Sequence, residues 1–114
     1  MKTQSAKAKG RRLQQKVAGM LLKYGDDLHE DDVLSRSMGA SGEDIMLSPA
    51  AREQYPLSIE CKSRAKFAVY ADMDQAISNS KDHEPVLVIK ANRREPLVVV
   101  DADFFFKLLR SKDA

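Results

Sequence analysis

The spacing of hydrophobic and polar positions changes along the chain and predicts alternating helices and strands. One apolar stripe at helical spacing predicts an amphipathic helix over residues 7–24, which ends at Gly25. A second helical pattern covers residues 66–79. The first stripe consists of Leu13, Val17, Met20, Leu21, Tyr24 and Leu28, and the second of Val69, Tyr70, Met73, Ala76 and Ile77.

Shorter apolar runs predict strands, and the segment 48–56 reads as a loop. The unbroken apolar runs VLVIKA and LVVVDA indicate burial on both faces of the last two strands. Asp101 or Asp103 could cap a final helix over residues 104–110. The expected strands are 31–37, 43–47, 57–62, 86–91 and 97–102. The order α-β-β-β-α-β-β-α predicts an α/β fold, a mixed central β-sheet flanked by helices, in one domain over residues 1–114.

The third predicted strand places an acid and an amine on one face. Side chains alternate along a strand, so Glu60 and Lys62 stand together while Ile59 and Cys61 face the other way. Asp44 begins the second predicted strand after a glycine turn. If the two strands are neighbours, Asp44 and Glu60 converge at one end of the sheet.

Two carboxylates and a backbone carbonyl, such as that of Cys61, are ligands that suit Mg²⁺, with Mn²⁺ able to substitute. Such a metal would activate water against a phosphodiester, and Lys62 would orient that water or offset charge on the phosphate. The alternative reading of this E-x-K sequence is a plain ion pair on an exposed strand.

The charge of the chain is uneven although its net value is only +2. Seven Lys or Arg residues and no acid occupy residues 1–23, and residues 1–8 read as a basic, flexible arm. This distribution suits a phosphate backbone, although a solvated terminus is the alternative. The candidate phosphate contacts are Lys9, Arg11 and Arg12 in the first helix and Arg64 and Lys66 after the third strand.

The remaining composition limits the other function classes. No apolar run reaches the ~20 residues of a membrane helix, so no membrane partner is expected. The single Cys61 suits a reducing, cytoplasmic setting. The three consecutive residues Phe104, Phe105 and Phe106 cannot all face one core, and a contiguous exposed patch there would indicate a dimer surface.

These motifs resemble those of the PD-(D/E)xK nuclease superfamily. "ED" at 43–44 stands at the place of its "PD", and "ECK" at 60–62 at the place of its (D/E)xK. The segments "KGRRLQQKV", "VLSRSMGASGEDIML" and "SIECKSR" are most similar to archaeal-type and phage Holliday-junction resolvases. The resemblance covers most of residues 9–77 and implies a restriction-endonuclease-like α-β-β-β-α-β core.

The resemblance implies a role for each matching residue. Asp44 and Glu60 would be metal ligands, Lys62 the catalytic lysine, and Ser37, or less favourably Ser35, would lie near the scissile phosphate. The turn before Asp44 would contact DNA, with glycines that let the backbone approach closely. The residues of that turn are Arg36, Ser37, Gly39, Ser41 and Gly42.

Two positions depart from the family pattern. Glu43 replaces the proline before the aspartate and either is neutral or adds a carboxylate to the site. Gln14 stands where many relatives carry a metal-binding glutamate in the first helix, because Gln15 points into solvent on the helical wheel. An amide oxygen can coordinate a metal but adds no charge, so weaker metal affinity is expected. The alternative is that Gln14 is a plain boundary residue.

The resulting expectation is an Mg²⁺-dependent endodeoxyribonuclease that resolves four-way junctions. A homodimer is expected because two symmetric cuts need two active sites. The size of the chain would suit a viral genome and action in a host cell. The alternatives are a nuclease for nicks, flaps or repair substrates, a catalytically impaired DNA-binding module of this fold, or an interaction protein unrelated to nucleic acid.

Overall fold

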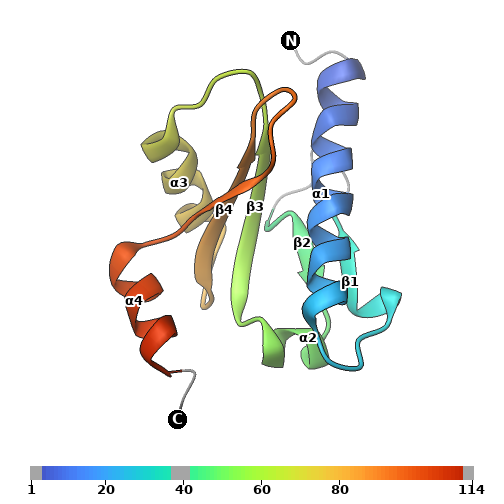
Figure 1. The fold of residues 1–114 in the computed structure, drawn as a ribbon, viewed down its shortest axis with the longest axis vertical. Helices are drawn as coiled ribbons and strands as arrows, with labels where there is room; N and C mark the ends of the chain where they lie inside the picture. Colours follow the sequence, from blue (N-terminus) through green and yellow to red (C-terminus); the bar gives the residue numbers. More distant parts are fainter. Residues whose placement is uncertain (1–3, 37–41, 112–114) are drawn as a thin grey trace.

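The protein is described from a computed structural model that covers residues 4–36 and 42–111. In Figure 1 the long helix α1 (Gln4–Tyr24) lies beside two small sheets. Residues 4–8, expected in a flexible arm, instead form the first turns of this helix. Ser37, Gly39 and Ser41, predicted to contact DNA, lie outside the described residues.

The expected strands form two sheets rather than one. Strands β1 (Val33–Ser35) and β2 (Ile45–Leu47) pair antiparallel. In the second sheet, β3 (Leu57–Ser63) pairs parallel with β4 (Glu84–Lys90), which pairs antiparallel with β5 (Leu97–Val99). The expectation of an α/β fold with a mixed sheet flanked by helices is confirmed.

The remaining elements connect these strands. A short 3₁₀ helix, η1 (Glu30–Asp32), precedes β1, so the first strand starts later than expected. Residues 48–56 were expected to form a loop, which is wrong, because they contain helix α2 (Pro49–Gln54). Helices α3 (Val69–Ser78) and α4 (Ala102–Ser111) match the two other predicted helices. The backbone N–H of Phe104 donates to Asp101 Oδ2 (3.0 Å), which identifies Asp101 as the cap of α4.

The core lies between α1 and one face of the larger sheet. Leu13 and Val17 of α1 join Val33, Ile45 and Ile59 in one buried cluster. The opposite face of β3 and β4 is also buried. There, Leu87 of β4 and Ala76 of α3 are almost inaccessible to solvent. This two-sided burial agrees with the prediction for β4.

Two parts of the predicted core are exposed. In β5, Leu97 and Val98 are more than 60% exposed, so burial on both faces is wrong for this edge strand. In α3, the predicted arc is partly wrong: Ala76 is buried as expected, but Tyr70 is 89% exposed and Asp72, outside the predicted arc, is buried. Within the described residues, no helix combines the length and hydrophobicity that a membrane span requires.

Candidate active site at the edge of β3

Asp44 is held by its backbone and its side chain at the free edge of β3. Its N–H donates to the carbonyl of Ile59 (2.9 Å), and its Oδ2 accepts from the N–H of Cys61 (2.7 Å). The N–H and C=O of one residue project to the same side of a strand, so the Cys61 carbonyl also lies at this edge. These bonds join the two sheets and place a carboxylate beside the third strand, as the sequence predicted.

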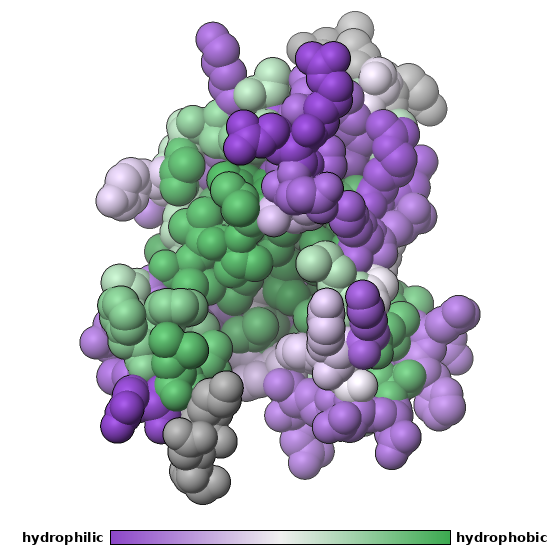
Figure 2. Space-filling view, in the orientation of Figure 1, coloured by the Kyte–Doolittle hydropathy of each residue, from purple (hydrophilic) through white to green (hydrophobic). Residues whose placement is uncertain are grey.

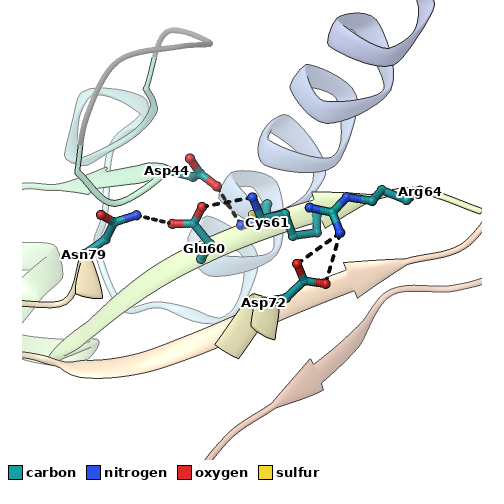
Figure 3. A network of polar contacts seen from close by, with 7 residues as sticks. Asp44, Glu60, Cys61, Arg64, Asp72 and Asn79 are labelled. Carbon is teal, nitrogen blue, oxygen red and sulfur yellow. Dashed lines mark hydrogen bonds and ion pairs between the residues drawn. The ribbon is translucent and has the colours of Figure 1, made fainter. Parts of the chain in front are cut away.

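Glu60 lies next to Asp44 and is 5% exposed. Asn79 Nδ2, at the end of α3, donates to Glu60 Oε1 (3.1 Å), and Lys62 Nζ lies 3.6 Å from Glu60 Oε2. Figure 3 shows the carboxylates of Asp44 and Glu60 close together, with the Asn79 amide beside that of Glu60. The predicted trio therefore converges.

The electrostatics of this site favour a cation. Burial raises the pKa of Glu60, and the charge of Asp44 raises that pKa further, while the Asn79 hydrogen bond and Lys62 oppose the shift. The effect of burial and of the neighbouring carboxylate prevails, so Lys62 only partly compensates the negative charge. Burial, followed by the charges of Asp44 and Glu60, also raises the pKa of the Cys61 thiol, which is therefore a poor nucleophile here.

The oxygen donors at this site fit a hard divalent metal, although only two of them belong to charged side chains. Two carboxylates and a carbonyl oxygen meet at one strand edge, and oxygen ligands of this kind are those that Mg²⁺ prefers. Among the described residues, no group of three or more His, Cys, Asp or Glu side chains could hold a metal. The charge available to a metal at this site thus comes from Asp44 and Glu60.

Glu43 does not add its carboxylate to this site. Arg52 Nη2 of α2 donates to Glu43 Oε1 (2.7 Å), and Arg52 Nη1 donates to the Leu57 carbonyl (2.6 Å). This ion pair fastens α2 to the start of β2 and β3. Of the two possibilities for Glu43, an added carboxylate at the site is therefore not supported, and the residue instead holds Arg52.

The segment before Asp44 is positioned by Arg36 and Gly42. The Arg36 N–H donates to the Asp44 carbonyl (2.7 Å), and its side chain donates to the Glu43 carbonyl. Gly42 has φ 100°, a conformation that glycine adopts without strain, and a Cβ there would lie 3.4 Å from the Arg36 guanidinium. The glycine predicted here is therefore required by the turn itself.

Gln14 is buried, with 4% of its surface exposed, and is not the boundary residue that the alternative interpretation described. Its neighbour Gln15 is exposed, as predicted from the helical wheel. Helix α1 packs on β1 and β3 through the residues beside Gln14, which include Leu13 and Val17. The assignment of Gln14 to the glutamate position of the resembled family stays a prediction.

Two contacts near the site were not predicted from the sequence. Arg64, expected to contact DNA, lies 3.0 Å from Asp72 Oδ1, and Asp72 is 5% exposed (Figure 3). This pair fixes α3 against the end of β3. Asn79 was also missed as a partner of Glu60, because the end of a helix gives no sign in sequence of which strand it faces.

The other predicted phosphate contacts lie on the surface. Arg11, Arg12 and Lys66 are exposed, and Lys9 is half-buried, with its Nζ 3.0 Å from Asn92 Oδ1 in the β4–β5 turn. Comparisons of the chain with protein-family models, with curated proteins and with solved structures found no match.

Proposed function

We propose that this protein is a metal-dependent DNA endonuclease of the PD-(D/E)xK type, acting on four-way DNA junctions. The observation that carries the proposal is the convergence of Asp44, Glu60 and Lys62 at the edge of β3. The restriction-endonuclease-like interpretation of the fold, with its α-β-β-β-α-β core, belongs to the same proposal.

In this proposal, Asp44, Glu60 and the Cys61 carbonyl hold Mg²⁺, with Gln14 as a possible neutral ligand. Mg²⁺ or Mn²⁺ at this place would polarise the scissile phosphodiester and lower the pKa of an attacking water. The N–H of Cys61 orients the Asp44 carboxylate, and Asn79 orients that of Glu60. The cation would relieve the repulsion that raises the pKa of Glu60.

Lys62 is suited to act on the reacting phosphate. Its side chain is 14% exposed and its ammonium lies on the same face of β3 as Glu60. We assign it to position the attacking water and to stabilise negative charge that develops on the phosphate oxygens. Arg36 and Gly42 would present the preceding turn to the DNA backbone, and Ser37 would lie near the scissile phosphate.

The junction as substrate follows from the family resemblance and from the requirement for paired cuts. One chain supplies one such site, so two cuts in one junction require a homodimer. A nuclease for nicks or flaps would use the same site with another DNA shape. A catalytically impaired DNA-binding module is the second candidate function, and the buried amide of Gln14 in place of a carboxylate favours it.

The first experiment compares cleavage of a synthetic four-way junction with cleavage of linear duplex of the same sequence, in Mg²⁺, Mn²⁺ or EDTA. The Asp44→Asn variant is the sharpest control, because it keeps an oxygen for the Cys61 N–H but removes the charge. We expect paired cuts in the junction that require metal and that are lost in Asp44→Asn and Glu60→Ala.

The other outcomes separate the candidate functions. Cuts in flaps or nicked duplex alone would move the substrate to the repair class while keeping the site. Junction binding without cleavage in either metal would favour the DNA-binding module. A protein that neither binds nor cuts any of these DNAs would refute the nuclease proposal.

A further inference from the structure

A basic pocket separate from the candidate active site lies between α1 and the β4–β5 turn. Its volume is about 480 Å³, and none of the described residues that line it is acidic. In Figure 1 the start of α1 and this turn lie at the same end of the molecule, and Figure 2 shows hydrophilic side chains gathered there. The lining cations are Lys9, Arg12, Lys16, Lys90 and Arg93.

The position of the pocket follows from the register of the larger sheet. Ser63 and Lys90, which both line the pocket, are paired residues at the ends of β3 and β4. Ser63 directly follows Lys62, and successive side chains of a strand point to opposite faces. The pocket therefore lies at the end of the sheet nearest Lys62 but on the face that α1 covers.

Little negative charge in the described structure neutralises these cations. Lys9 Nζ contacts the neutral Asn92 Oδ1, a hydrogen bond that ties α1 to the turn. Lys16 Nζ lies 3.6 Å from Glu95, whose side chain is 87% exposed, and an ion pair so exposed is weak. Arg12 and Arg93 line the pocket and are exposed to solvent.

The backbone of Arg93 adds a second observation. Its φ of 59° is in the left-handed region, which is unfavourable for a residue with a long side chain and favourable for glycine. The turn thus holds an arginine where glycine would relieve strain.

We propose that this pocket binds a backbone phosphate of DNA other than the one that is cut. Lysine and arginine side chains gathered around one concavity recognise phosphate through charge-assisted hydrogen bonds. Because the pocket and Lys62 lie on opposite faces at one end of the sheet, the phosphate in the pocket is not the scissile one. The choice of DNA as the source of this phosphate rests on the proposed function.

Two double variants with equal loss of charge test this proposal. The pocket variant is Arg12→Ala with Arg93→Gly, where glycine suits the positive φ and protects the fold. The control is Lys23→Ala with Arg94→Ala, which also removes one cation from α1 and one from the turn, but neither lines the pocket. Binding to a fluorescent four-way junction is measured in EDTA over a series of salt concentrations, so that no cleavage is needed.

We expect the pocket variant to bind at least about tenfold more weakly than the control at moderate salt. Its slope of log K against log salt should be smaller than that of the wild type by about 1, because the one phosphate held in the pocket is no longer neutralised. In the cleavage assay it should raise KM and leave kcat close to the wild-type value. Thermal melting should show that both variants are folded.

Equal weakening in the two double variants would overturn the proposal, since the charge alone would then matter. Millimolar inorganic phosphate at constant ionic strength should reduce the difference between the two double variants, because it competes with the backbone phosphate for the pocket. A larger difference in binding between the pocket variant and the control for RNA than for DNA would contradict DNA as the assigned partner. A protein without nuclease activity whose variants still differ in DNA binding would refute only the proposed function.

Discussion

At the scale of one residue, Glu60 occupies an environment that is unfavourable for a carboxylate. A carboxylate that is 5% exposed, beside a second carboxylate, costs free energy that burial of an apolar residue would not. The hydrogen bond from Asn79 and the ammonium of Lys62 reduce this cost without removing it. Residues kept in such an environment are candidates for chemistry on physical grounds.

Gln14 provides the sharpest test at this scale. In Gln14→Glu, the carboxylate that the proposal places beside Asp44 and Glu60 should strengthen Mg²⁺ binding about tenfold, which is ~1.4 kcal/mol. The metal-free variant should be less stable by about 1–3 kcal/mol, because another charge is buried. Isothermal titration calorimetry and urea unfolding in EDTA measure the two effects.

The adjacent Gln15→Glu is the matched control, since Gln15 is exposed. It should change neither the metal affinity nor the stability by a comparable amount. If both substitutions act alike on Mg²⁺ binding, Gln14 does not face the metal site, and its assignment to the glutamate position is wrong.

At the scale of elements, helix α2 is fixed by a small polar cluster. Ser48 caps α2 by accepting from the Ala51 N–H (3.1 Å), and its hydroxyl donates to Asp32 Oδ1 (2.6 Å). Asp32 Oδ2 also accepts from the His29 N–H (2.8 Å). The hydroxyl of Ser48, followed by the His29 N–H, lowers the pKa of Asp32.

We expect Ser48→Ala to lower the free energy of unfolding by about 1 kcal/mol, the usual cost of a lost N-cap.

The lowered pKa of Asp32 means that its ionised form stabilises the fold. This contribution is present above the ordinary Asp pKa of 3.8 and is lost as the pH falls below it. The stability difference between wild type and Asp32→Asn, followed by thermal melts, should therefore shrink below about pH 4.

The outcome for each element depended on how local its signal was. Helix α2 carries a readable signal, Ser48 before Pro49, but the proline-containing segment reads equally well as a turn. The arc of α3 was partly wrong because Asp72 is buried against Arg64, a partner that only the folded chain reveals. The convergence of Asp44, Glu60 and Lys62 could be predicted from two simple relations. Alternation along β3 places Glu60 and Lys62 on one face, and the position of the second strand beside the third brings Asp44 to them.

At the scale of the whole molecule, an apolar groove of about 340 Å³ runs between α1, the larger sheet and α4. Figure 2 shows hydrophobic side chains gathered over this part of the surface. Helix α4 has a pronounced apolar face, yet none of its residues is buried. The groove includes Val98 of β5 and Phe105 and Leu108 of α4, which are 62%, 43% and 53% exposed.

An exposed apolar surface of this kind usually marks an interface. The proposed paired cleavage requires two sites, so we assign the surface to a second copy of the same chain. A stable dimer buries on the order of 800 Å² per partner, and a groove flanked by a helix that lacks cover offers a place for such contact. Of the exposed phenylalanines expected from the sequence, Phe105 belongs to this interface in our proposal.

Phe105→Asp should convert the protein from dimer to monomer, because a charge would have to be buried in the apolar groove. Phe106→Asp is the matched control: it makes the same change one residue further along α4, where the side chain does not line the groove. Light scattering after size exclusion measures the mass, and junction cleavage reports whether the two cuts remain paired. A wild-type protein that is monomeric at the concentrations at which it makes paired cuts would contradict this arrangement. If Phe105→Asp gives monomers that make single, unpaired cuts and Phe106→Asp does not, the dimer formed through the apolar groove is what brings two active sites to one junction.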